Sequence, residues 1–308
     1  NNTGVGRNAL AANTTGASNT AVGRNCLDAN TTASSNTAMG ESTLTACTTG
    51  ATNTALGANA MGILTTGADN VAVGASALNQ SNASNNVAVG KAALGANTTG
   101  ASNVAVGSLA LDANTTGTKH TAVGYSAGTA VDGSEENTLI GAYSGQGITG
   151  GGYNTCLGAY TGAYGVSITT GTKNVCIGDY AHTSAADSVT QTVLGYNVAG
   201  SGDSTLTFGT GTTDTTCSYG GTTWSAPSDI RLKEDIQDEV VGLDFINELR
   251  PVTFRWKKAK DVPSEMKVHV PDSEERVMDG KYNHGFVAQE VKEVIDNNPD
   301  IKEGFDMW

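Results

Sequence analysis

The chain has 308 residues, of which 40 are glycine, 6% are aromatic and 15% are charged, and its net charge at pH 7 is −13. Globular domains carry about 25% charged residues, so this composition argues against an ordinary globular core. The negative charge argues against binding to nucleic acid, which needs Lys and Arg to neutralise phosphates. No stretch approaches the roughly 20 apolar residues of a membrane span. Because the chain begins with Asn rather than Met, we expect a fragment or a processed product.

A pentapeptide, Asn-(Thr/Val)-Ala-(Val/Leu/Met)-Gly, recurs with its variants through residues 1–200. Nine of the eleven steps between neighbouring copies are 17 residues long, and the other two are 16 and 20. Disorder would not maintain such a period, so the sequence predicts a repeat architecture. The copies begin at Asn2, Asn19, Asn36, Asn53, Asn70, Asn86, Asn103, His120, Asn137, Asn154, Asn174 and Gln191.

Two apolar positions recur within the unit. The ninth position is Leu or Met in the first seven units, and the fifth is always Gly. A polar turn, often Asn-Thr-Thr-Gly, closes the unit. The fourth position is apolar in every copy: Val5, Val22, Met39, Leu56, Val73, Val89, Val106, Val123, Ile140, Leu157, Ile177 and Leu194.

These short apolar segments predict strands rather than helices, because Gly, Asn and Thr are poor residues for a helix interior. We expect one coil of two short strands and two turns per unit, with coils stacked about 4.8 Å apart. The side chains at positions four and nine are predicted to form two rows that face the inside of the coils. The Thr and Asn side chains are predicted to form ladders on the outside. Burial of one Val and one Leu contributes about 3–6 kcal/mol per coil, whereas ordering the backbone costs about 1–2 kcal/mol per residue. So thin a core indicates that further burial comes from association between chains.

The Asn-Thr-Ala-Val-Gly coils of residues 1–200 resemble the head repeats of trimeric autotransporter adhesins and the repeat shafts of tailed-phage fibres. The resemblance implies a mostly β fold, a homotrimeric β-solenoid (β-roll) shaft exposed on a virion. Its expected partners are other virion tail or baseplate proteins and a host surface glycan or protein receptor.

Cysteines and tyrosines enter the repeats at defined places. The five cysteines lack zinc-ligand spacing, and we expect no metal and no cofactor. Cys156 and Cys176 stand where other units carry Ala or Val, so they are predicted to be small buried residues. Two interpretations of the tyrosines stay open: an exposed aromatic surface for a glycan receptor, or side chains that fill wider coils or grooves between chains. They are Tyr125, Tyr143, Tyr153, Tyr160, Tyr164 and Tyr180.

The period is lost after residue 200, and residues 201–227 are predicted to be a capping or linking β segment with a short strand at 204–209. From Ser228 onward 31 of 81 residues are charged, against 16 of the preceding 227, which marks a domain boundary. Residues 228–308 are predicted to be a small α+β domain. We expect a helix at 242–249, a strand at 252–256 and a second helix that follows residues 284–290 and ends before Pro299.

Three segments of this domain resemble, in this order, the intramolecular chaperone of endosialidases and other phage tail spikes. They are SDIRLKEDI (228–236), LRPVTFRWK (249–257) and GFVAQEV (285–291). The resemblance implies a trimeric chaperone that assembles the preceding fibre and often releases itself, and it indicates that the domain is incomplete at its C-terminus. It also implies a serine–lysine dyad of Ser228 and Lys233, with Asp229 and Arg231 in supporting roles.

In the expected reaction Ser228 attacks the carbonyl of Pro227, and Lys233, with a pKa lowered by burial, accepts the hydroxyl proton. Hydrolysis of the ester would free residues 1–227 from the chaperone. Whether this self-cleavage is active stays open. The leading hypothesis is a receptor-binding bacteriophage tail fibre, and the alternative is a trimeric bacterial surface adhesin. A glycan-degrading spike would need paired carboxylates in a groove, and residues 1–227 hold only 11 acidic residues, most of them scattered.

Overall fold

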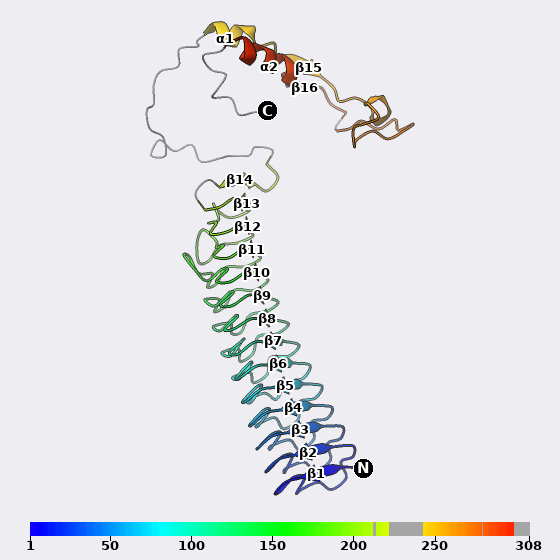
Figure 1. Cartoon of the computed structure of the whole chain (residues 1–308), viewed down its shortest axis with the longest axis vertical. Helices are drawn as coiled ribbons and strands as arrows, with labels where there is room; N and C mark the ends of the chain where they lie inside the picture. The colour runs from blue at the N-terminus through cyan, green and yellow to red at the C-terminus, as the bar shows by residue number, and fades with distance from the viewer. Residues whose placement is uncertain (212–213, 222–242, 279, 299–308) are drawn as a thin grey trace. The chain divides into compact units, whose positions relative to one another are not determined.

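The computed structural model describes residues 1–211, 214–221, 243–278 and 280–298. The chain divides into two compact units, Asn1–Asp229 and Ile230–Trp308. The first unit is a β-solenoid whose 14 strands follow one another in chain order in a single sheet (Figure 1). The described part of the second unit holds a two-stranded sheet with helices α1 and α2. The predicted fold class, a β-solenoid followed by a small α+β region, is confirmed.

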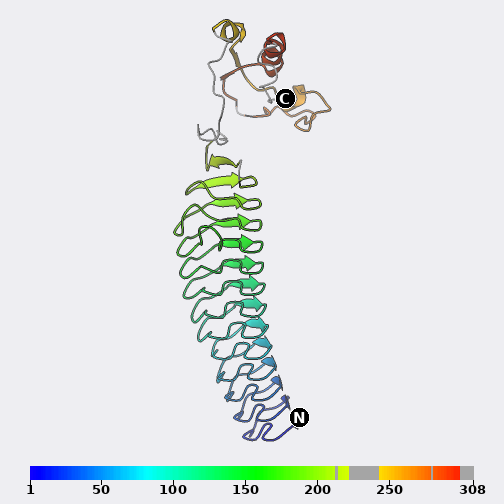
Figure 2. The ribbon, with the colours of Figure 1, turned by 60° about the vertical axis from the view of Figure 1, so that its left-hand side comes forward.

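Each repeat makes one coil, and each coil adds one three-residue strand to a parallel, in-register sheet (Figure 2). β13 (Thr205–Phe208), which confirms the strand predicted at 204–209, continues the parallel pairing, and β14 (Thr215–Ser218) pairs antiparallel with it. The twelve strands of the repeats are β1 (Thr3–Val5), β2 (Thr20–Val22), β3 (Thr37–Met39), β4 (Thr54–Leu56), β5 (Val71–Val73), β6 (Val87–Val89), β7 (Val104–Val106), β8 (Thr121–Val123), β9 (Thr138–Ile140), β10 (Thr155–Leu157), β11 (Val175–Ile177) and β12 (Thr192–Leu194).

The prediction of two strands per coil is wrong, because the side of the coil opposite the strand is built from turns. Residues there adopt left-handed backbone conformations, such as Ala92 (φ 54°) and Leu94 (φ 51°), which a strand does not contain. The coil-to-coil hydrogen bonds persist nevertheless, since the backbone N–H of Leu94 donates to the carbonyl of Ala110 at 3.0 Å. This side of the solenoid is therefore a ladder of stacked turns.

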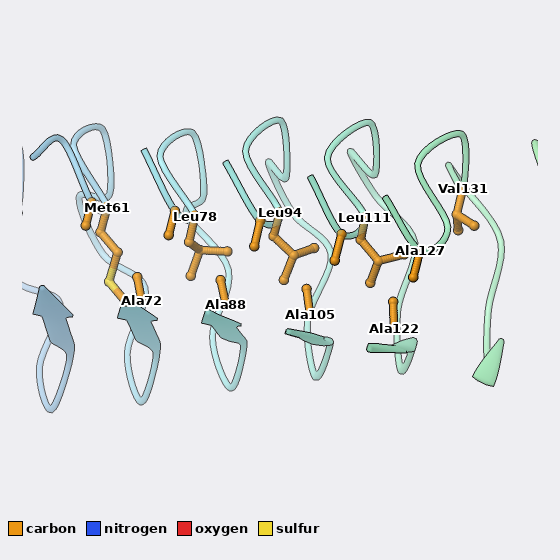
Figure 3. Packing of buried hydrophobic residues seen from close by; sticks show 14 of the residues in the cluster. Met61, Ala72, Leu78, Ala88, Leu94, Ala105, Leu111, Ala122, Ala127 and Val131 are labelled. Carbon is orange, nitrogen blue, oxygen red and sulfur yellow. The ribbon is translucent and has the colours of Figure 1, made fainter. Parts of the chain in front are cut away.

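The core of each coil is filled by a small side chain from the strand and a large one from the turn side (Figure 3). Ala88 and Ala105, at position three, and Leu94, at position nine, are fully buried. The inward row at position nine is confirmed. The inward row at position four is wrong, since Leu56 is 44% exposed. A three-residue strand points its middle residue one way and its neighbours the other, so burial of position three leaves position four on the outer face.

From Asn19 onward the asparagines of position one are buried, so the prediction that they form an outward ladder is wrong. Asn53 is typical of them: its Oδ1 accepts the backbone N–H of Asn70 at 3.0 Å, and its Nδ2 donates to the carbonyl of Gly67 at 2.9 Å. One side chain thus connects neighbouring coils and closes the turn of its own coil. Buried polar groups need such partners, and the repeat supplies them at every step.

The second unit contains α1 (Leu243–Glu248), β15 (Val252–Phe254), the 3-10 helix η2 (Ala259–Asp261), β16 (Asn283–Gly285) and α2 (Ala288–Asn297). The two predicted helices and the strand from residue 252 are confirmed. β16, which pairs antiparallel with β15, lies where the sequence predicted only the approach to a helix. Its three residues, Asn-His-Gly, carry no β-branched or aromatic signal.

Candidate functional site

One surface of the solenoid carries an apolar stripe, formed by the position-four residues from Val5 to Leu194 that were named above. All twelve are exposed or half-buried. Leu157 in β10 is 43% exposed and Met39 in β3 is 47% exposed. Position two of the same strands is Thr or Val in every coil, so no charge interrupts this surface. A long uncharged patch of this kind marks an interaction surface. Because neighbouring residues of a strand point to opposite faces, positions three and four cannot both face inward.

The tyrosines of the later coils stack on one another outside the core. The ring of Tyr160 lies parallel to those of Tyr143 and Tyr180, with centroids 4.8 and 5.4 Å apart. The interpretation that tyrosines fill the coil interior is wrong, because Leu139 and Ile148 are among the residues buried there. The other two interpretations, a receptor surface and a groove between chains, are not decided by this stacking.

Two of the three segments that carry the chaperone resemblance come together in the second unit. β15 and β16 pair with Val252 opposite Gly285. Arg250, just before β15, forms an ion pair with Glu290 in the first turn of α2, and its Nε lies 3.0 Å from Glu290 Oε2. The hydrogen bond from Arg250 lowers the pKa of Glu290, and the same pair raises the pKa of Arg250. The paired guanidinium and carboxylate hold the first strand against the second helix.

A second cluster of charges joins the loop after β15 to residue 274. Lys258 and Lys260 both donate to the carboxylate of Glu274. These hydrogen bonds, first from Lys258 and then from Lys260, lower the pKa of Glu274 to about 2. All three side chains are more than one third exposed, so solvent screens the attraction.

The second unit leaves much apolar surface open to solvent. In its described part only Ala259 and Ile295 are buried apolar residues. A pocket of about 320 Å³ with a mainly apolar lining lies beside Trp256, Val262 and Met266. The described part of this unit therefore buries little apolar surface in its own packing. Its exposed large apolar residues are Leu243, Ile246, Trp256, Met266, Val268, Val270, Met278, Tyr282 and Phe286.

The predicted cleavage site lies outside the described residues. This applies to Pro227, Ser228, Asp229, Arg231 and Lys233 alike, so their roles stay predictions. Elsewhere in the chain, the described residues hold no cluster of three or more His, Cys, Asp or Glu side chains that could bind a metal ion. No helix in the described ranges has the length and apolarity to cross a bilayer.

Cys156 and Cys176 are fully buried and lie directly opposite each other in β10 and β11. The prediction that they act as small core residues is confirmed. The hydrogen bond between the two thiols and their burial raise the pKa of Cys156 well above its usual value. Neutral, buried thiols of this kind are unreactive.

The fold is a β-solenoid followed by a charged α+β unit whose described part leaves much apolar surface uncovered. In a comparison with known families, residues 228–298 match the serine peptidase family described as chaperone of endosialidase. The matched range contains all three segments on which the resemblance was based. No curated protein and no solved structure matches the chain.

Proposed function

We propose that the chain is a homotrimeric fibre of a bacteriophage tail, with the solenoid as its shaft and the C-terminal unit as the chaperone that assembles it. The observation that carries the proposal is the apolar stripe. A chain that exposes an apolar residue at the same position of twelve consecutive coils needs a partner with the same period. A second and third copy of the same chain provide one.

The energetics favour association along the stripe. Full burial of one Val, Leu, Ile or Met side chain contributes about 1.5–3 kcal/mol, and these residues are already partly covered. Twelve of them together contribute on the order of 10 kcal/mol, which is comparable to the cost of bringing chains together. The same reasoning applies to the second unit, whose exposed apolar residues find no cover within its own described part. The number of three copies is taken from the resemblance to trimeric fibres and chaperones. It agrees with the closed rotational symmetry that most homo-oligomers adopt.

The proposed function also includes attachment. One end of the fibre would join other tail or baseplate proteins, and the shaft would present three equivalent weak binding sites to a host surface glycan or protein receptor. Three linked sites bind more tightly than one because the second and third contacts are intramolecular.

The trimer is tested by measuring mass in solution by light scattering. Ser228→Ala is used as the background to keep the chain whole, and we expect about three times the chain mass of 31.2 kDa. Leu56→Asp with Leu157→Asp would place charges in the stripe and reduce the mass to that of one chain. The matched control is Thr66→Asp with Thr170→Asp, two exposed turn positions of the same coils, which should leave the trimer intact. A monomeric parent protein would contradict the proposal.

We propose in addition that Ser228 and Lys233 cleave the Pro227–Ser228 bond after assembly. The hydroxyl of Ser228 attacks the Pro227 carbonyl and its proton passes to neutral Lys233. The C–N bond between Pro227 and Ser228 then breaks as Lys233 returns the proton to the amino group of Ser228, which leaves an ester. Water hydrolyses this ester to the carboxylate of Pro227 and the free hydroxyl of Ser228. A denaturing gel checks this: the parent chain should give two fragments, and Ser228→Ala or Lys233→Ala one full-length band. Full-length chain in all three samples would show that the dyad does not operate.

A further inference from the structure

A hollow of about 330 Å³ opens on the solenoid where three consecutive coils meet. It is lined by residues 133–135, Gly150, Gly152, Tyr153 and Thr172. These residues occupy the positions just before β9, β10 and β11, whereas the apolar stripe is formed by position four of the strands. The hollow is therefore built by a single chain and from other residues than the stripe.

Two coils at the hollow lack a side chain that most other coils carry. At the fourteenth position of the unit, Thr15, Thr32, Thr49, Thr66, Thr99 and Thr116 stand where these coils have Gly133 and Gly150. A Cβ on Gly150 would meet no atom within 4 Å. Gly150 also lacks the positive φ that would require glycine. Neither close packing nor backbone conformation requires glycine at position 150. The absence of a side chain there leaves open space beside the backbone.

The lining combines three kinds of chemistry. Tyr153 is 50% exposed and offers an aromatic ring. The carboxylate of Glu135, an exposed residue, can accept hydrogen bonds, and the hydroxyl of half-buried Thr172 can donate or accept them. Lys119, the neighbouring cation, is paired with Glu136, with Nζ 2.8 Å from the carboxylate oxygen, so Glu135 is left as an acceptor.

We propose that this hollow binds one neutral sugar ring of a surface polysaccharide. A pyranose has a face of C–H groups, which packs on an aromatic ring, and a rim of hydroxyls, which donate to a carboxylate and exchange hydrogen bonds with a threonine hydroxyl. The volume lies at the lower end of the range of small-molecule sites, about 300–1,000 Å³, which fits one ring rather than a protein segment. The carboxylate of Glu135 in the lining disfavours carboxylated sugars, because like charges repel.

If the chain is the proposed fibre, a sugar bound in this hollow is the chemical class of its receptor. Only this role as a receptor rests on the proposed function; the binding of the sugar does not. Binding is tested by saturation-transfer NMR on the whole chain with the methyl glycosides of glucose, galactose, mannose and N-acetylglucosamine at millimolar concentration. We expect at least one glycoside to receive saturation, and N-acetylneuraminic acid to receive none.

The decisive variant is Gly150→Thr, which restores the residue that other coils carry and fills the hollow. It should reduce the signal at least tenfold, with an unchanged unfolding temperature as evidence that the coil still folds. Tyr153→Ala and Glu135→Gln should each weaken the signal, and Thr66→Ala, at the same position of a distant coil, should not. Absence of signal from all four glycosides, or a signal that survives Gly150→Thr, overturns the inference. The mass measurement keeps the two proposals separate. A trimer that binds none of the glycosides would disprove only this sugar site, and a monomer that binds a glycoside would disprove only the trimeric fibre.

Discussion

The solenoid and the C-terminal unit are held together in opposite ways. The solenoid has few charges, repeats one coil twelve times and buries a side chain from strand and turn in almost every coil. The C-terminal unit is rich in charge, has no repeat and buries two apolar residues in its described part. In the solenoid most of the stabilising contacts are made between one coil and the next, as in other repeat proteins. In the C-terminal unit the ion pairs lie at the surface, where each contributes little.

The two parts leave apolar surface exposed for different reasons. In the solenoid the position-one asparagines find hydrogen-bond partners in their own and the neighbouring coil, and the apolar stripe is exposed because it faces away from the core. The described part of the C-terminal unit leaves most of its large apolar residues exposed because few of its side chains are buried. Disturbing the contact between two coils should therefore be far more costly than disturbing an ion pair of the C-terminal unit.

The largest effect is expected from Gly107→Ala in the solenoid. Gly107 has a φ of 137°, and a Cβ there would lie 2.2 Å from the carbonyl oxygen of Gly124 in the next coil. The two coils would have to separate, so we expect a loss of more than about 4 kcal/mol of stability. Urea unfolding followed by far-ultraviolet circular dichroism measures it. Gly150→Ala is the matched control and should change stability by less than about 0.5 kcal/mol; equal losses in both variants would show that stacking of the glycines is not the constraint.

An intermediate effect is expected at His120, which replaces Asn in the buried ladder. Its Nδ1 accepts the backbone N–H of Asn137 at 3.2 Å, and its own backbone N–H donates to Oδ1 of Asn103. Burial lowers the pKa of His120 to about 4, because a charged ring there would lose its hydration. The unfolded chain, with a His pKa of about 6.5, binds the proton first. Stability is therefore full above pH 6.5 and falls by about 3 kcal/mol as the pH drops to 4.

His120→Asn restores the residue of the other coils and supplies the test. The variant should lose the fall in stability between pH 6.5 and 4, measured as the difference in unfolding free energy from the parent chain. The difference removes the contribution of carboxylates, which titrate in both proteins. Parallel pH profiles of the two proteins would contradict this account of the ladder.

Much of the solenoid could be predicted from sequence because its period determines which residues stack. Steps of 17 residues are enough to place Leu94 over Leu111 and Gly107 over Gly124. The period does not say which side of a strand faces inward. Ala88 and Val89 are both apolar, and the strand pattern alone does not say that Ala88 is the buried one.

The candidate sites were less predictable for a different reason. The ion pair of Arg250 with Glu290 joins residues 40 apart, and no local pattern specifies that contact. The hollow at Gly150 leaves a signal, a missing Thr in an otherwise regular turn, but its meaning depends on the neighbouring coils. Ser228 and Lys233 were inferred from resemblance, lie outside the described residues and stay predictions.

The smallest effect is expected from Glu274→Gln in the C-terminal unit. Its carboxylate is exposed and receives hydrogen bonds from Lys258 and Lys260. Because the pKa of Glu274 is lowered to about 2 from 4.5, its contribution is present above pH 4.5 and is lost as the pH falls toward 2. All three tryptophans lie beyond residue 220, so tryptophan fluorescence follows this part of the chain. We expect a small decrease in unfolding temperature at pH 7 and low salt that disappears near 1 M salt, where the Debye length is about 3 Å. Glu265→Gln, at another exposed glutamate of the unit, should show no such salt dependence, and an equal response of the two variants would mean that the lysine pairs contribute nothing specific.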